Sequence, residues 1–144
     1  MKANKEFGQL LFKMSRLIRD EMTFNCYAAR LSMLQYHTLV FLKEKKKVQM
    51  NEIAEHFHIE MPTATSLLNK LVSLHLVKRT SDKKDRRIVF TALTKKGQEV
   101  LKEALQLHNK KVNMILGALS PREQSSLFKI LQTVVANLEE QYER

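Results

Sequence analysis

The sequence is poor in residues that interrupt or cross-link a chain: its 144 residues include one cysteine, three glycines, two prolines and no tryptophan. A single cysteine excludes an intramolecular disulfide, as expected in a reducing cytosol. So few glycines and prolines leave room for few loops and favour helices. No apolar run approaches the roughly 20 residues that span a bilayer, and the N-terminus lacks the apolar core of a signal peptide. The sequence therefore predicts a cytoplasmic protein without a membrane partner.

The common catalytic motifs are also missing. The sequence contains no glycine-rich phosphate loop, no G-x-S-x-G, no H-E-x-x-H and no C-x-x-C. The paired acids Glu139 and Glu140 lie in an amphipathic segment, where the solvated face of a helix explains them. We therefore expect no enzymatic activity, no cofactor and no metal site.

Positive charge is in clear excess. The chain has 25 lysines and arginines against 15 aspartates and glutamates, which gives a formal net charge of +10 and a pI near 9.8. Such a balance favours polyanionic partners. One basic cluster consists of Lys43, Lys45, Lys46 and Lys47, for which a solvated loop is at least as good an explanation as contact with a nucleic-acid backbone.

The richest cluster of charge lies in a predicted β-hairpin. Two β-prone runs, residues 77–80 and 88–94, flank a polar connection of seven residues, 81–87. Residues 78–87 carry six basic and two acidic side chains. In isolation such a segment is more often a solvated surface hairpin. Its shape and charge also suit contact with phosphates or a DNA groove.

Two helices are predicted directly upstream of this hairpin. A short amphipathic segment at 50–57 and a break at 58–60 lead to Pro62, which marks the start of a second helix ending near Leu74. The apolar stripe of the second helix follows a three- and four-residue spacing and consists of Ala64, Leu67, Leu68, Leu71 and Leu74. Its opposite face has no acid and carries Thr63, Thr65, Ser66, Asn69, Lys70 and Ser73. Two helices, a tight turn and a basic hairpin predict a winged helix-turn-helix whose second helix enters the major groove.

The hairpin resembles the wing of the MarR family of bacterial transcriptional regulators, which carries D-x-R, five residues, L-T and a nearby glycine. Here these positions are Asp85 to Arg87, residues 88–92, Leu93 with Thr94, and Gly97. Upstream, V-Q-M-N-E-I-A is similar to the first helix of the family's helix-turn-helix, and P-T to the start of its recognition helix. The resemblance covers essentially the whole chain. It implies a mainly α fold with a small β-hairpin wing, flanked by N- and C-terminal dimerisation helices.

The polar helix face and the family resemblance together indicate the DNA-binding residues. The resemblance implies that Arg87 reaches a minor groove from the wing tip, with Asp85 holding its guanidinium. Asn69 can pair with adenine through two hydrogen bonds, whereas Lys70 mostly supplies charge. The full set of expected DNA-binding residues is Pro62, Thr63, Thr65, Ser66, Asn69, Lys70, Lys83, Lys84, Asp85, Arg86 and Arg87.

Three positions depart from the family pattern. His58 and His75 stand where members often have glycine, at the turn and at the end of the recognition helix. We expect left-handed backbone there, which histidine tolerates better than β-branched residues do. Glu60 stands where a serine N-cap is common; its carboxylate suits a helix N-terminus but repels phosphate.

The helices outside the winged lobe carry apolar stripes of their own. A stripe from Phe7 to Met22 is predicted near the start, and a further helix from about Leu31 to Lys43 precedes the helix-turn-helix. A long helix after the wing has an inward stripe predicted at Leu101, Leu105, His108, Val112, Ile115, Leu116 and Leu119. Gly117 marks its expected end. Ser120-Pro121-Arg122-Glu123 then has the pattern of a capping box at the start of the last helix.

These stripes predict a homodimer. A winged domain of about 60 residues cannot bury all three outer stripes by itself, whereas a second subunit can. The expected organisation is a single domain over 1–144, with a winged lobe at 31–94 and dimerisation helices at 1–25 and 95–144. The alternative is a helical bundle formed within one chain.

The family resemblance implies that a small phenolic or aromatic effector, an oxidant or a metal controls DNA binding. Polar groups interrupt apolar surfaces at the candidate effector-binding residues, as in many small-molecule pockets: Met14, Ile18, Tyr27, His37, Phe41, Leu105 and His108. Completion of a core explains these residues equally well. Cys26 is the alternative oxidant sensor, and His37 and His108, with Glu103 and Cys26, are the alternative zinc ligands. An inert thiol and structural histidines are the better interpretations.

The resulting hypothesis is a homodimeric, sequence-specific regulator that binds double-stranded DNA. It predicts a ligand-responsive repressor of a pseudo-palindromic operator. One alternative is a winged-helix nucleic-acid-binding architectural protein without effector sensing, which a palindromic footprint would exclude. Another is a wing that binds protein, whose binding would be insensitive to competing DNA.

Overall fold

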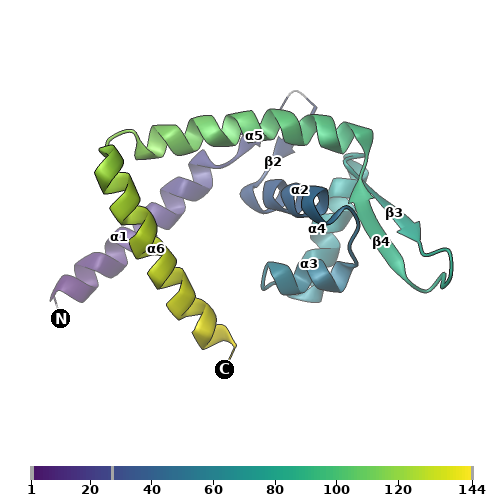
Figure 1. Cartoon of the computed structure of the whole chain (residues 1–144), viewed down its shortest axis with the longest axis horizontal. Coiled ribbons are helices and arrows are strands. Elements are labelled where there is room, and N and C mark those ends of the chain that lie inside the picture. The colour runs from purple at the N-terminus through teal and green to yellow at the C-terminus, as the bar shows by residue number, and fades with distance from the viewer. Residues whose placement is uncertain (1, 27, 144) are drawn as a thin grey trace. The chain divides into compact units, whose positions relative to one another are not determined.

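The computed structural model describes residues 2–26 and 28–143, and helices dominate it (Figure 1). In chain order the elements are α1 (Lys2–Glu21), β1 (Phe24–Asn25), β2 (Arg30–Leu31), α2 (Met33–Lys45), α3 (Met50–His56), α4 (Met61–Ser73), β3 (Val77–Ser81), β4 (Val89–Leu93), α5 (Lys95–Leu116) and α6 (Pro121–Tyr142). The predicted mainly α fold with a β-hairpin wing is confirmed. The chain divides into two compact units, one ending at His108 and the other beginning at Asn109.

The centre of the first unit is the helix-turn-helix formed by α3 and α4. Ile53 of α3 is buried against α4, whose Leu68 and Leu71 are buried as well. The turn between them closes where the Ile59 amide donates to the Ala54 carbonyl (3.0 Å). His58 in this turn has a φ of 50°, and His75 after α4 has a φ of 59°, so both are left-handed as predicted.

The helix before the helix-turn-helix begins two residues later than expected. Leu31 pairs with Phe24 in the short antiparallel β1–β2 ladder, and both side chains are fully buried. Ser32 then caps α2, because its hydroxyl accepts from the Gln35 amide (3.2 Å) and the Gln35 side chain accepts from the Ser32 amide (2.9 Å). The β1–β2 ladder was not predicted, since two-residue strands leave no periodic pattern to detect.

The hairpin β3–β4 projects from the helix-turn-helix as a wing (Figure 1). The strands pair antiparallel from Val77 opposite Leu93 to Ser81 opposite Val89. They begin and end within a residue of the predicted runs, although Ile88 belongs to the connection rather than to a strand. Val48 extends the sheet at its base, where it exchanges two backbone hydrogen bonds with Thr91 (3.0 and 2.7 Å).

The start of α5 is fixed against the end of α4. The Thr94 hydroxyl donates to the His75 carbonyl (2.6 Å) and accepts from the Gly97 amide (2.9 Å). The Lys96 ammonium donates to the Leu74 carbonyl (3.0 Å). Of the predicted inward stripe of α5, Leu101 is buried and His108, Val112, Leu116 and Leu119 are half-buried. Leu105 and Ile115 of this stripe are 42% and 41% exposed in the single chain, so their predicted burial is left to a partner subunit.

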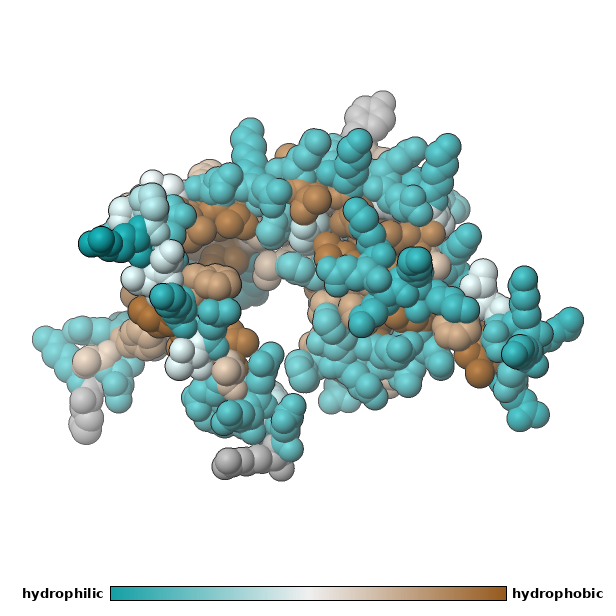
Figure 2. Space-filling view, viewed as in Figure 1, coloured by the Kyte–Doolittle hydropathy of each residue, from teal (hydrophilic) through white to brown (hydrophobic). Residues whose placement is uncertain are grey.

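The second unit contains the end of α5 and all of α6. The predicted capping box is present: the Ser120 hydroxyl accepts from the Glu123 amide (3.3 Å) and the Glu123 carboxylate accepts from the Ser120 amide (2.7 Å). Gly117 follows the last residue of α5, as predicted. Neither α1 nor α6 has a buried residue. Figure 2 shows apolar side chains at the surface of both helices.

Candidate nucleic-acid interface

The recognition helix α4 presents the predicted polar face to solvent. Its N-cap is Glu60, whose side chain makes no capping hydrogen bond, and Pro62 occupies the first turn. The exposed members of the predicted set on this helix are Pro62, Thr63, Ser66, Asn69 and Lys70. The opposite face is anchored in the core, so the polar face is held rigidly outward.

Thr65 differs from the other predicted members of this face. Its side chain is half-buried, and its hydroxyl lies 2.9 Å from the Met61 carbonyl and 3.1 Å from the Met50 sulfur. A hydroxyl engaged on both sides is less free to contact a base. Thr65 thus joins α4 to α3 at the first turn of the recognition helix.

The tip of the wing, the connection between β3 and β4, carries five charged side chains that were predicted to bind DNA. Lys83, Lys84, Asp85, Arg86 and Arg87 are all exposed, and Figure 2 shows hydrophilic atoms covering this end of the hairpin. The turn is closed by backbone bonds from Asp82 to Ile88 (2.8 Å) and from Ile88 to Asp85 (3.1 Å).

Asp85 holds the wing in a different way from the one that the family resemblance implied. Its carboxylate accepts from the backbone amide of Arg87 (3.0 Å), not from the guanidinium. The Asp82 carboxylate in turn accepts from the Asp85 amide (3.4 Å). Asp85 therefore shapes the backbone that carries Arg87 and leaves the guanidinium exposed.

Two contacts near this surface were missed by sequence reasoning. The Arg79 guanidinium donates to the Asn69 side-chain oxygen (2.6 Å), which joins the wing to the recognition helix. The Lys47 ammonium lies 4.4 Å from the centre of the Phe90 ring, a cation–π geometry that gives one member of the lysine cluster a place at the wing. Side chains alternate between the two faces of a β-strand, so Arg79 lies on the same face of β3 as buried Val77. This alternation could have indicated that Arg79 is directed toward α4.

Two of the predicted effector residues, His37 and His108, form an aromatic cluster with Tyr36, and the others that the structure describes lie elsewhere. His108 stacks on Tyr36 with ring centres 4.9 Å apart, and His37 packs edge-on against both rings. Phe41 is buried and stacks on His56 (4.1 Å). Met14 is exposed and Ile18 half-buried, both on α1. Tyr27 lies outside the described residues.

Burial shifts the pKa values of His37, Tyr36 and the thiol of Cys26. Although His37 keeps an exposed edge, desolvation of the rest lowers its pKa, and repulsion from His108 lowers it further. Burial also raises the pKa of the Tyr36 hydroxyl. The pKa of the Cys26 thiol is raised by burial and then by the Glu103 carboxylate. A buried thiol with a raised pKa is a poor oxidant sensor.

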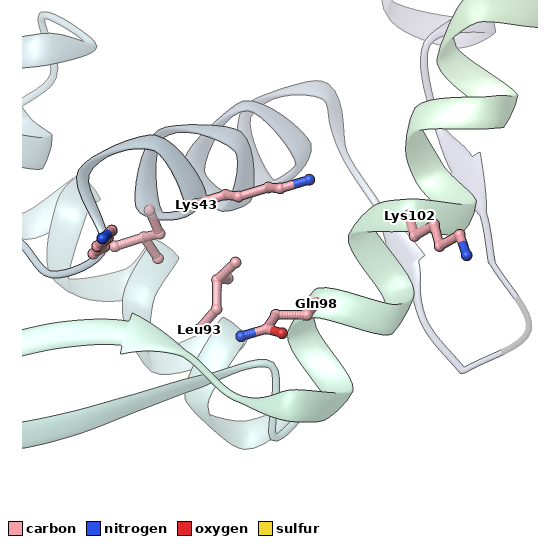
Figure 3. Close-up of a pocket in the computed structure, with 6 residues that line it drawn as sticks. Lys43, Leu93, Gln98 and Lys102 are labelled. Carbon is pink, nitrogen blue, oxygen red and sulfur yellow. The ribbon is translucent and has the colours of Figure 1, made fainter.

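Two cavities adjoin α2 and α5. One, of about 400 Å³, is lined by Tyr36, Val40, Lys43, Glu44, Leu101 and Leu105. The other, of about 570 Å³ (Figure 3), is lined by Leu42, Lys43, Lys46, Leu93, Gln98 and Lys102. Among the predicted effector residues that the structure describes, only Leu105 lines either cavity.

The described residues contain no group of three or more His, Cys, Asp or Glu side chains placed to hold a metal ion. In residues 2–26 and 28–143, none of the helices combines the length and the apolar character needed to cross a bilayer.

Known proteins share both the sequence pattern and this fold. The model of the MarR family matches residues 31–89, which contain α2 to β3 and the wing connection. The uncharacterised HTH-type transcriptional regulator YfiV of Bacillus subtilis is 28% identical over 109 residues, covering 76% of this chain and 68% of YfiV.

Solved structures agree over more of the chain. A MarR mutant from E. coli in complex with operator DNA has a TM-score of 0.77 at 20% identity, covering 90% of this chain and 93% of that one. BpsR of Bordetella bronchiseptica, whose DNA binding is regulated by 6-hydroxynicotinic acid, has a TM-score of 0.76 at 20% identity, covering 90% and 98%. By their names, YfiV is a transcriptional regulator, and MarR and BpsR bind DNA. Residues 31–89 therefore match the MarR family, and the chain has the winged helix-turn-helix fold of the solved MarR structure.

Proposed function

We propose that the protein is a homodimeric repressor that binds a pseudo-palindromic operator in double-stranded DNA and is released from it by a small aromatic ligand. The observation that carries this proposal is the pairing of an acid-free polar face on α4 with an exposed cationic wing tip. Two such lobes in a twofold dimer would meet successive major grooves, roughly 10 bp apart. A repressor acts by occluding a promoter at such a site.

Selection of bound duplexes from random DNA by the full-length protein tests the proposal. A pseudo-palindrome with half-sites one helical turn apart is the expected product. Recovery of unrelated sequences with similar affinity would instead favour the architectural alternative. The complex of E. coli MarR with operator DNA supports the operator hypothesis by analogy of fold.

The two polar side chains at the centre of α4 are expected to have separate roles. Asn69→Ala should relax sequence preference, because an amide contacts base edges directly. Lys70→Ala should weaken binding to all sequences alike and flatten the salt dependence by about one phosphate contact. Affinities for operator and scrambled duplexes at several salt concentrations measure both effects. Unaltered preference and salt dependence in both variants would remove α4 from the interface.

Arg87→Ala is expected to lower operator affinity about 10- to 100-fold, the loss of roughly 1–3 kcal/mol. The exposed guanidinium at the wing tip suits a narrow minor groove, where negative potential is concentrated. Fluorescence anisotropy with a labelled operator measures the change, and circular dichroism checks the fold.

Two further variants test whether the loss of operator affinity is specific to Arg87. Asp85→Ala should weaken binding less, because its carboxylate supports only the backbone of the turn. Arg122→Ala removes one positive charge at the start of α6 and should leave affinity nearly unchanged. Wild-type affinity in a folded Arg87→Ala protein would exclude Arg87 from the interface.

The effector proposal centres on the cavity of about 400 Å³ between α2 and α5. Tyr36, whose ring is stacked on His108, lines it together with apolar Val40 and Leu105. This combination suits a planar phenolic or aromatic ligand. A ligand there would release DNA only if it binds the DNA-incompetent arrangement of the dimer more tightly. The regulation of BpsR by 6-hydroxynicotinic acid supports an aromatic ligand class.

Titration of simple phenols, hydroxylated aromatic acids and Zn²⁺ against the protein–DNA complex tests this proposal. We expect an aromatic compound to release DNA from the wild type. His37→Ala and His108→Ala, which remove rings packed against Tyr36 in the cavity wall, should need more of it. Lys102→Ala, which alters the other cavity, is the matched control and should respond as the wild type does. If neither class of compound releases DNA and both histidine variants match the wild type, the histidines are structural.

A further inference from the structure

We propose that Arg79 is a specificity-determining residue, which holds the Asn69 carbonyl and makes the pair select guanine rather than adenine. This inference rests on the proposed operator binding and assigns one base of the half-site. The inference is based on the 2.6 Å hydrogen bond that the Arg79 guanidinium donates to the Asn69 side-chain oxygen. Both side chains are exposed, at the junction of the recognition helix and the wing.

The position of Arg79 follows from strand geometry. Alternate residues of a strand face the same side, so Arg79 shares a face with Val77, which is buried. Its partner across the hairpin, Thr91, is buried as well. Arg79 is therefore directed toward α4 rather than away from it, whereas exposed Lys78 lies on the opposite face.

Hydrogen-bonding chemistry fixes the orientation of the Asn69 amide. A guanidinium has donors only, so the Asn69 atom that meets it must be the oxygen. The amide NH₂ group is then the part of Asn69 left for a base edge. Beside it are the remaining N–H groups of Arg79, so the pair presents donors.

A surface of donors discriminates between the two purines. In the major groove guanine presents two acceptors, N7 and O6, whereas adenine presents the acceptor N7 and the N6 amino donor. Asn69 alone would match adenine by accepting from N6 with its oxygen. Here that oxygen is engaged by a cation, in a charge-assisted bond roughly twice as strong as a neutral one. Guanine fits the donor pair without breaking this bond.

The test compares base preferences of full-length variants by selection from random DNA. Asn69→Ala first identifies the position concerned, as the one at which preference is lost. At that position the wild type should favour guanine over adenine by about tenfold or more. Arg79→Met should shift the preference to adenine, because the freed amide can pair with both N6 and N7. Arg79→Ala is measured alongside, so that a packing defect of the methionine does not decide the result.

Two controls separate this effect from loss of charge. Lys78→Met removes the same charge from the other face of β3 and should weaken all sequences without changing the preferred base. Arg79→Lys retains a donor-only cation and should keep guanine. A wild-type preference for adenine, or a guanine preference that survives Arg79→Met and Arg79→Ala, overturns the inference while operator binding stands. If the wild type selects no palindromic sequence, both the proposed function and this inference are wrong.

Discussion

Gly97→Ala is expected to lower the free energy of unfolding by about 3 kcal/mol, the upper range for forcing extra atoms into a packed core. A Cβ atom built on Gly97 would overlap the Leu76 carbonyl oxygen, which is backbone and has no rotamer by which to move away. Leu76 is fully buried and precedes β3, so displacing it disturbs both α4 and the wing. Denaturant unfolding at fixed protein concentration measures the loss.

The chain provides a matched control for this substitution. A Cβ atom at Gly8, in the exposed helix α1, would meet nothing within 4 Å. Gly8→Ala should therefore stabilise the protein by up to about 1 kcal/mol, because alanine is the better helix former. The two substitutions add the same methyl group and should have opposite signs. Equal effects would show that close packing of α5 on the Leu76 backbone does not matter for stability.

Loss of packing at Gly97 should also impair DNA binding. The Thr94 hydroxyl and the Lys96 ammonium join the start of α5 to the end of α4 through the His75 and Leu74 carbonyls. These bonds set where β3 leaves the recognition helix, and hence where the wing tip lies. We expect the Gly97→Ala protein to bind operator weakly even at temperatures where it remains folded.

The winged lobe could be predicted because each of its parts leaves a local pattern. Ala64, Leu67, Leu68 and Leu71 follow the helical period, and all four are buried. The polar connection between two β-prone runs indicated the wing to within a residue. The left-handed backbone of His58 and His75 also followed from the positions of glycine in the family pattern. These features depend on neighbours in sequence, which a sequence displays directly.

Contacts between distant residues were predicted less well. The Arg79–Asn69 bond depends on the angle at which β3 leaves α4, and the engagement of Thr65 with Met50 depends on how α3 packs. Strand alternation places Arg79 on the same face as Val77, but it does not set this angle, and the contact of Thr65 with Met50 has no periodic pattern at all. Lys46 adopts a φ of 67° without being glycine, which no local feature of the lysine cluster indicated. The apolar stripe of α5 that contains Leu105 was also predicted from helical spacing alone. Spacing cannot say whether such a stripe is covered by the same chain or by a second subunit.

The terminal helices are expected to form a dimer that a single charge can disrupt. Large apolar residues of α6 are exposed within the chain, among them Leu131 at 46%, Val134 at 48% and Leu138 at 48%. The α1 helix has a similar exposed stripe, with Phe7 at 62% and Leu10 at 61%. Apolar surface of this extent, repeated at helical spacing, is typical of protein–protein interfaces.

Leu131→Glu is the decisive variant, because its outcome depends on whether a partner covers this face. On an isolated chain the change replaces an exposed residue and should be nearly neutral, within about 0.5 kcal/mol. In a dimer it would bury a charge in apolar surroundings, which is costly enough to abolish association. Thr133→Glu adds the same charge on the opposite face of α6 by helical spacing and should leave the dimer intact.

Sedimentation equilibrium at low micromolar concentration separates these outcomes. The wild type and Thr133→Glu should sediment as dimers, and Leu131→Glu as a monomer or as aggregates. Deletion of residues 1–20 should have the same effect as Leu131→Glu, because it removes α1 and uncovers the surface that α1 of either subunit would occupy. Loss of the dimer should also abolish selection of a palindrome, since one lobe contacts only one half-site. A wild type that sediments as a well-behaved monomer would contradict the proposed arrangement, because the exposed apolar stripes of α1 and α6 would then need no partner.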